Sequence, residues 1–206
     1  MAHAGDIIEG PTIGQKIRFE VTGNDNGGEI TICNHFVAPK PQSIGPPLHT
    51  HKSQSEHYRV IRGSFGVHID GEDHVMGPGE DIFVPAMVPH YWWNEGTEEA
   101  HVILEFRPAE TIDAFFETLF GLSRDGKLDV QREPGKPPSA RPRNLVQAVA
   151  LSYDHGIGIC DVPVLPDASY LKPGIVASRP SPYWSTERII AFISFAVWTV
   201  TTRWLP

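Results

Sequence analysis

The most informative stretch of the sequence reads Gly45-Pro46-Pro47-Leu48-His49-Thr50-His51, and Glu56 and Gly63 follow it. Alternate residues of an extended strand share a face, so we expect His49 and His51 to point the same way. Two imidazoles presented together are suitable ligands for a divalent transition metal. Glu56 adds an anionic oxygen a few residues later. The stretch therefore predicts a metal site built on β-strands.

A second stretch supplies a fourth candidate ligand, His90, within Val84-Pro85-Ala86-Met87-Val88-Pro89-His90-Tyr91-Trp92-Trp93-Asn94. Trp92 shares strand parity with His90, so it is expected to line the same pocket, whereas Trp93 is expected to pack outside it. Tyr58 shares a face with Glu56 by the same reasoning. We therefore take Tyr58, Met87 and Trp92 as candidate substrate-binding residues, and for Trp92 a role in the core remains open.

Short alternating runs surround these motifs from about residue 15 to residue 107, and turn residues such as Asp70-Gly71 and Gly77-Pro78-Gly79 separate them. This pattern is typical of an antiparallel sandwich or barrel. The predicted strands are Lys16–Val21, Glu29–Val37, His57–Arg62, Phe65–Ile69, His74–Met76, Asp81–Val84, Tyr91–Trp93 and His101–Phe106.

The two motifs together resemble those of the cupin family. The spacing from His49 and His51 to Glu56 and Gly63 matches the first cupin motif, and the spacing from Gly79 through His90 to Asn94 matches the second. Met87 departs from the pattern, because it stands where the family has a glycine that lets the backbone turn ahead of the histidine. The resemblance implies an all-β double-stranded β-helix, a jelly-roll-like barrel.

The resemblance also implies a metal held by His49, His51, Glu56 and His90. Iron(II) is the ion expected first, with Mn²⁺, Ni²⁺ and Zn²⁺ as alternatives, and Glu56 is the candidate general base. We expect an Fe(II)-type dioxygenase or oxygenase acting on a small aromatic or polyketide-like molecule. Two other functions stay open: a non-redox metal-dependent isomerase, cyclase or lyase, and a non-catalytic barrel that senses a ligand or a metal.

The pattern changes after Pro108, which predicts a cupin barrel over residues 1–107 and a helical, proline-rich extension over residues 108–206. About three helices are expected in the extension, over Thr111–Leu122, over Asn144–Tyr153 and over residues 186–203. Thr111 and Asn144 are candidate N-caps. Arg124–Pro142 is predicted to be a loop because it is polar and rich in proline, and Gly156–Pro182 is predicted to be irregular.

The last predicted helix contains the uncharged run Ile189–Thr202, which is apolar on nearly all sides. Such a helix is buried or associated with a membrane. At about 1.5 Å per residue it is short for a bilayer of about 30 Å. Burial against the barrel or a partner subunit is favoured over contact with a membrane surface, and we expect a homodimer.

Charge and cysteine content limit the partners and the compartment. The formal net charge of -8 argues against a nucleic-acid partner, because phosphates require basic residues. The two cysteines cannot form a disulfide framework, and the first eleven residues lack a signal-peptide core. A cytoplasmic protein with a small-molecule substrate is therefore expected.

Eight of the ten histidines lie between His35 and His101. Of those outside the two motifs, four are expected to be solvent-exposed or capping residues: His57, His68, His74 and His101. His35 lies in an apolar strand, and a place facing the cavity stays open for it.

Overall fold

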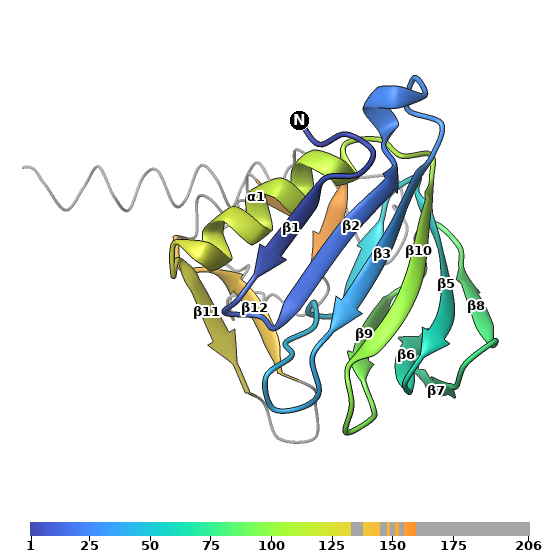
Figure 1. The fold of residues 1–206 in the computed structure, drawn as a ribbon, viewed down its shortest axis with the longest axis vertical. Coiled ribbons are helices and arrows are strands. Elements are labelled where there is room, and N and C mark those ends of the chain that lie inside the picture. Colours follow the sequence, from blue (N-terminus) through green and yellow to red (C-terminus); the bar gives the residue numbers. More distant parts are fainter. Residues whose placement is uncertain (133–137, 145–147, 149–150, 153–154, 160–206) are drawn as a thin grey trace, which may run out of the picture. The chain divides into compact units, whose positions relative to one another are not determined.

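Two antiparallel β-sheets make up a jelly-roll-like barrel in the computed structural model, which describes residues 1–132, 138–144, 148, 151–152 and 155–159 (Figure 1). The first sheet has six strands in the order β1-β2-β3-β10-β5-β8. Their bounds are Ile7–Gly10 (β1), Gln15–Val21 (β2), Thr31–Val37 (β3), Ala100–Arg107 (β10), Ser55–Arg62 (β5) and Asp81–Val84 (β8). A single 3-10 turn, Gly23–Asp25, links β2 to β3.

The second sheet has five strands in the order β13-β4-β9-β6-β7. Its members are Ile157–Ile159 (β13), His49–His51 (β4), His90–Asn94 (β9), Phe65–Ile69 (β6) and Glu72–Met76 (β7). From β4 onwards the chain passes repeatedly from one sheet to the other, so both sheets contribute to one interior. All eight strands predicted from the sequence are present, with ends that differ by a few residues.

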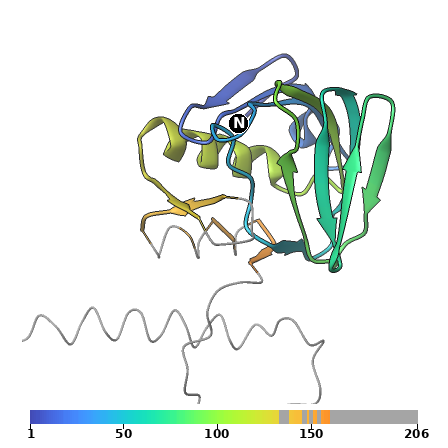
Figure 2. The same cartoon turned by 90° about the horizontal axis from the view of Figure 1, so that it is seen from below.

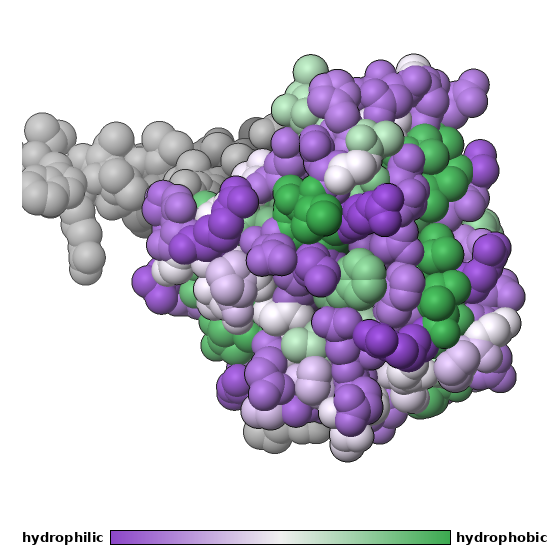
Figure 3. Space-filling view, in the orientation of Figure 1, coloured by the Kyte–Doolittle hydropathy of each residue, from purple (hydrophilic) through white to green (hydrophobic). Residues whose placement is uncertain are grey.

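Strand alternation places the core between the sheets. Along β3, buried residues alternate with partly exposed ones, and the outward positions are Ile32, Asn34 and Phe36. The face seen in Figure 3 is mostly hydrophilic, with apolar groups between the polar ones. The fully buried side chains of the interior include Phe19, His35, Tyr58, Val60, Phe65, Val67, His90 and Leu104.

The helix α1 (Ile112–Arg124) confirms the helix predicted from the spacing of apolar residues. Its buried face includes Ile112, Phe116 and Phe120, which follow one another at intervals of four residues. Asp113 accepts hydrogen bonds from the Gly23 amide (2.7 Å) and from the Thr31 hydroxyl (2.6 Å). These bonds join the start of the helix to the barrel.

The far end of α1 is joined to the barrel as well. The Thr12 amide donates to the Ser123 hydroxyl at 3.0 Å, and the Thr12 hydroxyl donates to the Ser123 carbonyl at 2.7 Å. The helix therefore lies fixed along β1 (Figure 1). Thr111 occupies the N-cap position as predicted, but its side chain makes no capping hydrogen bond.

The prediction of a loop over Arg124–Pro142 is wrong. Within it, β11 (Leu128–Gln131) and β12 (Ser139–Pro142) pair antiparallel in a separate two-stranded sheet. Pro142 is tolerated because it ends an edge strand, where no partner needs its missing amide hydrogen. The pairing depends on two segments separated by seven residues, which a local pattern of polar residues and prolines does not show.

The prediction of an irregular segment from Gly156 onwards is also wrong at its start, because Ile157–Ile159 form β13 and pair with β4. The rest of that segment lies outside the described residues. So does the helix expected over 186–203, with its apolar run Ile189–Thr202.

About three helices were expected, but α1 is the one complete helix in the part of the chain that the structure describes. Of the helix expected over Asn144–Tyr153, residues 148, 151 and 152 are described and helical. The boundary between a barrel domain and an extension at residue 107 stays a prediction.

Candidate metal centre

β4 and β9 bring three histidines together. His49 and His51 lie on one face of β4, and their ring centroids are 5.1 Å apart. The two strands pair at His49 and His90, whose ring centroids are 4.3 Å apart. The spacing of the sequence motif therefore predicted correctly that these imidazoles lie side by side.

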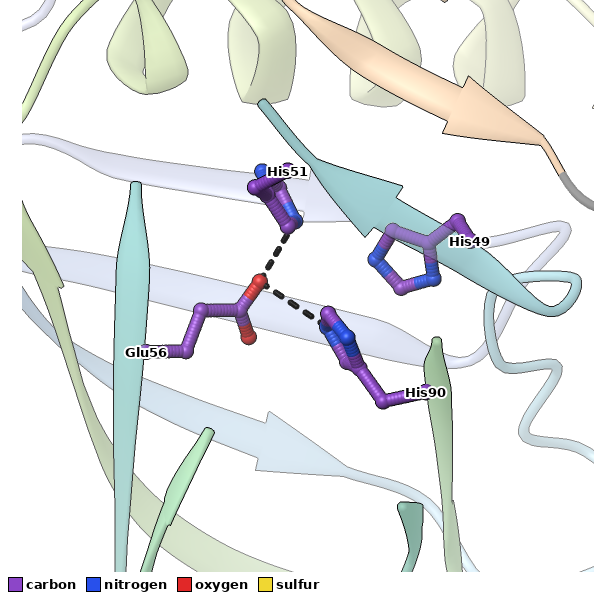
Figure 4. Close-up of side chains that lie close together, drawn as sticks. All are labelled: His49, His51, Glu56 and His90. Atoms are coloured by element: carbon purple, nitrogen blue, oxygen red, sulfur yellow. Dashed lines mark hydrogen bonds and ion pairs between the residues drawn. The ribbon is translucent and has the colours of Figure 1, made fainter. Parts of the chain in front are cut away.

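Glu56, near the start of β5 in the opposite sheet, faces these histidines (Figure 4). Its Oε1 lies 2.5 Å from Nε2 of His51 and 3.2 Å from Nε2 of His90. Each of the four residues offers one ligand atom, and these atoms all lie within 4.8 Å of one another. All four side chains are buried, with His49 the most exposed at 7%. The structure thus gathers the whole predicted ligand set.

Backbone carbonyls orient two of the imidazoles. Nδ1 of His49 lies 3.0 Å from the Pro47 carbonyl, and Nδ1 of His90 lies 2.9 Å from the Val88 carbonyl. A carbonyl only accepts hydrogen bonds, so Nδ1 must carry the proton and donate. Nε2 then keeps its lone pair when the ring is neutral, which is the arrangement usual for metal-binding histidines.

His51 provides the test of whether a metal fits the site. It is buried, yet neither of its ring nitrogens has a hydrogen-bond partner, since Nε2 approaches Glu56 without the alignment of a hydrogen bond. Buried polar atoms are normally satisfied, and one left unpaired costs free energy. A divalent ion between His51 and Glu56 would satisfy Nε2 and separate the two crowded atoms. The residues present therefore fit a metal ion.

The electrostatics of the cluster agree with this fit. Burial acts to raise the pKa of Glu56, but the positive charges that His51 and His90 can carry outweigh it and hold that pKa well below its ordinary range. Burial lowers the pKa of His49 well below its ordinary value, and the neighbouring histidines add to the shift. Glu56 is therefore ionised and His49 neutral, as metal ligands must be.

The pKa of His90 shifts in the direction opposite to that of His49. Burial acts to lower its pKa, but the carboxylate of Glu56 outweighs burial and raises it. A metal ion at Nε2 of His90 would compete with a proton for that nitrogen, so metal binding would depend on pH.

Tyr58 lies directly behind the carboxylate. Its side chain is fully buried, and its hydroxyl donates a hydrogen bond to Oε2 of Glu56, the oxygen that faces away from His51 and His90. Burial, together with the charge of Glu56, raises the pKa of Tyr58 well above its ordinary value, so the hydroxyl keeps its proton. This contact gives Tyr58 a role in positioning Glu56, and its contact with a substrate stays a prediction.

Trp92 and Met87 occupy different surroundings. The Trp92 ring is 8% exposed and stacks on Phe65, with the His35 ring against its edge, so it contributes to the core. Met87 is 40% exposed and has a positive φ of 66°. Its amide donates to the His51 carbonyl at 2.8 Å. The backbone turn that a glycine normally makes here is thus kept, in a conformation that is unfavourable for methionine.

His35 is a buried interior residue, a possibility that the sequence left open. Its Nε2 lies 3.0 Å from Oε1 of Gln15, and its Nδ1 has no hydrogen-bond partner. Burial lowers its pKa to about 3. The parity of β3 was the available signal, because Thr31, Cys33, His35 and Val37 all face inwards. Parity could not reveal the partner, Gln15, which comes from β2.

The remaining histidines of the barrel lie outside the cluster. His57 is within 2.6 Å of Asp81, His68 within 2.5 Å of Asp73, and His101 within 2.7 Å of Asn34. These three and His74 are at least partly exposed, as expected. Trp93 lies on the face opposite Trp92, as predicted, and its indole covers Gly66, where a Cβ atom would come within 2.2 Å of the ring.

The described part of the chain contains no helix with the length and hydropathy of a membrane span.

Two curated proteins are similar to part of the chain. A protein of Hypocrea virens named as a probable oxidoreductase is 26% identical over 120 residues, which are 53% of this chain and 55% of the relative. An oxidoreductase of Arthrobotrys oligospora is 30% identical over 105 residues, which are 47% of this chain and 42% of the relative. The chain thus spans about half the length of the curated relatives it matches.

Among solved structures, an RmlC-like cupin from Shewanella frigidimarina is 22% identical, with a TM-score of 0.43 over 52% of this chain and 87% of its own. The family model described as "Cupin domain" matches residues 35–106, the segment that contains all four candidate ligands. Together with the two motifs and the jelly-roll-like barrel, this match identifies residues 35–106 as a cupin domain.

Proposed function

We propose that this protein is a metal-dependent cupin enzyme in which His49, His51, Glu56 and His90 hold Fe²⁺. The reaction we propose is an oxygenase or dioxygenase reaction on a small aromatic or polyketide-like molecule. The observation that carries the proposal is the buried cluster of four ligand atoms within 4.8 Å of one another. The names of the two curated relatives, both oxidoreductases, support an oxidative reaction.

The donor set suits this chemistry. Three imidazole nitrogens and one carboxylate oxygen suit iron, manganese, nickel or zinc, and they leave positions of a six-coordinate ion open for substrate. When bound, such an ion supplies Lewis acidity toward substrate oxygens and, as Fe(II), a partner for dioxygen.

The chain's own residues then bind, orient and move protons. Tyr58 holds Oε2 of Glu56, so that Oε1 is directed at the site. The lowered pKa of Glu56 keeps its carboxylate free of a proton, and we propose this carboxylate as the general base for an acidic C–H or O–H group of the substrate. His49 and His90 are fixed through Nδ1 by the carbonyls of the residues two positions before them, which keeps their Nε2 atoms directed at the site.

Apolar side chains near the cluster favour an apolar or aromatic substrate. The Phe106 ring lies 6.5 Å from that of His51, measured between centroids. Met87 is partly exposed beside the ligand strand. A site lined in this way would favour an uncharged organic molecule over a sugar phosphate, which requires basic residues.

Elemental analysis of the freshly purified full-length protein tests the metal site. We expect close to one divalent ion per chain, and its loss in His49→Ala, His51→Ala and His90→Ala. His57→Ala and His68→Ala are matched controls, because these histidines lie outside the cluster and should leave the metal content unchanged. Retention of the metal in all three ligand variants would contradict the proposed site.

An oxygen electrode tests the reaction. The iron-loaded protein is expected to consume dioxygen with polyphenols or 1,3-diketones, and Glu56→Gln is expected to lose this activity. Turnover of these compounds without oxygen uptake would contradict an oxygenase and indicate the non-redox isomerase, cyclase or lyase. Metal binding without any turnover of these compounds would favour the non-catalytic sensor.

A further inference from the structure

The strand that carries two of the four candidate ligands has little pairing with the other strands of residues 1–107. β4 has three residues, and its pairing with β9 is confined to His49 and His90. Elsewhere in the same sheet, β6 pairs with β9 and with β7 over five residues each. The positions of His49 and His51 must therefore depend on contacts from elsewhere.

Residues that follow position 107 supply these contacts. On the other edge of β4, β13 pairs antiparallel, with Ile157 opposite His51, Gly158 opposite Thr50 and Ile159 opposite His49. The Lys52 amide continues the ladder by donating to the Gly156 carbonyl at 3.0 Å. The strand beside β4 in Figure 4 is this segment.

Other residues after position 107 contact the chain just before β4. The Gly45 amide donates to the Pro138 carbonyl at 3.2 Å, and Gly45 forms a parallel β-bridge with Ser139. Residues 45–52, which bear His49 and His51, are thus held at both ends by residues that follow position 107.

β13 has an anchor of its own. The Thr111 hydroxyl lies 2.6 Å from Nδ1 of His155, and the His155 ring packs edge-on against Phe115 at 5.6 Å between centroids. Thr111 precedes α1, which hydrogen bonds join to the barrel at both ends. The strand is therefore tied to the start of a fixed helix.

The hydrogen-bond pattern determines where Ile157 points. In an antiparallel ladder, hydrogen-bonded pairs alternate with non-hydrogen-bonded ones. The bond from Lys52 to Gly156 makes the next pair, His51 and Ile157, non-hydrogen-bonded. The side chains of such a pair lie on the same face with their Cβ atoms about 4.5–5.5 Å apart. Ile157, which is buried, thus lies beside the His51 imidazole.

We propose that β13 is a structural part of the metal centre: it holds β4 so that His49 and His51 face Glu56 and His90 together, and Ile157 walls the site beside His51. This inference rests on the proposed metal site. It assigns a role in metal binding to residues outside the segment that matches the cupin domain.

Zn²⁺ affinity, measured by competition with a chromophoric chelator on full-length protein, tests the inference. Gly158→Pro removes the amide opposite Thr50, and Gly158→Ala keeps it. Because loss of a group that orients a ligand typically weakens metal affinity 10–100-fold, we expect at least tenfold weaker binding for Gly158→Pro. Gly158→Ala keeps this amide, so its Zn²⁺ affinity should stay within about twofold of that of wild type. Equal affinities of the two variants would overturn the inference.

A measurement on the unaltered protein avoids any doubt about the folding of Gly158→Pro. Coupling between two sites is reciprocal, so if β13 pairing strengthens Zn²⁺ binding, Zn²⁺ must strengthen β13 pairing. Hydrogen exchange of the Lys52 and Gly158 amides should therefore slow at least tenfold when Zn²⁺ saturates the site, while exchange in β7 should not change. Unchanged exchange at both amides would overturn the inference.

His51→Ala distinguishes this inference from the proposed function. If His51→Ala binds Zn²⁺ as wild type does, the metal site itself is wrong. If His51→Ala loses Zn²⁺ while Gly158→Pro retains it, the metal site stands and only the role of β13 is wrong.

Discussion

The Tyr58 hydroxyl donates a hydrogen bond to Oε2 of Glu56, while Oε1 of the same carboxylate faces His51 and His90. Both Tyr58 and Glu56 are buried, so water cannot replace this contact. The two residues stand on the same face of β5, two positions apart. Tyr58 thus determines which oxygen of Glu56 is available to a metal ion.

Tyr58→Phe removes this hydrogen bond without opening a large cavity. We expect the divalent-metal affinity to fall about 10-fold or more, as for other groups that orient a metal ligand. We also expect a loss of about 1–3 kcal/mol in the free energy of unfolding, because Oε2 is left buried and unpaired. Chelator competition and urea unfolding of the metal-free protein measure the two effects.

Tyr91→Phe is the matched control for this change. Tyr91 is stacked on His68 and lies on the face of β9 opposite His90. The metal affinity of Tyr91→Phe should equal that of wild type. If both variants bind the metal as wild type does, Tyr58 does not position Glu56.

Met87→Gly should stabilise the fold slightly. The φ of 66° at Met87 costs an L-residue about 1–2 kcal/mol, and glycine avoids that cost but loses about 0.5–1 kcal/mol in backbone entropy. The net expected gain is on the order of 0.5–1 kcal/mol. Thermal unfolding of the metal-free variant would measure it. A clear destabilisation would show that the Met87 side chain makes packing contacts that outweigh the backbone cost.

His35 should make the metal-free protein sensitive to mild acid. Its pKa is about 3 in the fold and 6.5 ordinarily, because burial disfavours the charged ring. The unfolded chain thus binds the proton first, and the stabilisation that is present above pH 6.5 is lost as the pH falls toward 3. We expect a loss of about 2 kcal/mol between pH 7 and pH 5 from this residue.

His35→Gln isolates this effect, because glutamine does not titrate and can still bond to Gln15. Urea unfolding at pH 7 and pH 5, with a chelator present, should show a smaller pH dependence for the variant than for wild type. Parallel pH dependences for the two proteins would mean that His35 does not take up its proton on unfolding.

Gly45→Ala should disturb the segment that leads into β4. A Cβ atom at residue 45 would lie 2.3 Å from the Trp92 carbonyl oxygen, so the backbone has to shift. We expect a destabilisation of about 1–3 kcal/mol, which is typical of overpacking, together with weaker metal binding, since His49 lies four residues further on. Gly77→Ala is the control, because only the end of the Glu80 side chain comes near, at 3.7 Å. Equal stabilities of the two variants would contradict the close contact.

Local patterns were sufficient wherever structure depends on near neighbours in the chain. The parity of extended strands placed His49 and His51 on one face, and helical spacing predicted α1 from Ile112, Phe116 and neighbouring apolar residues. The motif spacing also identified Glu56 and His90, because their positions follow from a barrel with a regular order of strands.

Such local patterns did not predict contacts between segments that are distant in the sequence. β11 and β12 were predicted to be a loop, and the start of β13 irregular, because strands of three or four residues with proline nearby become stable only when a partner is present. The positive φ of Met87 likewise follows from the fixed path between β8 and β9, since residue type alone disfavours it.

The amino-acid order thus specified the strands and the helix α1, because strand parity and helical periodicity act over a few residues, and the resemblance to the cupin motifs supplied the set of candidate ligands. Tertiary packing decided that Tyr58 holds Glu56, that Trp92 lies in the core and that β13 pairs with the ligand strand. Those outcomes depend on which buried groups meet across the two sheets and on where a short strand finds its hydrogen-bond partners. The acidic, histidine-rich first half therefore carries the ligands, while part of what holds them in place comes from residues after position 107.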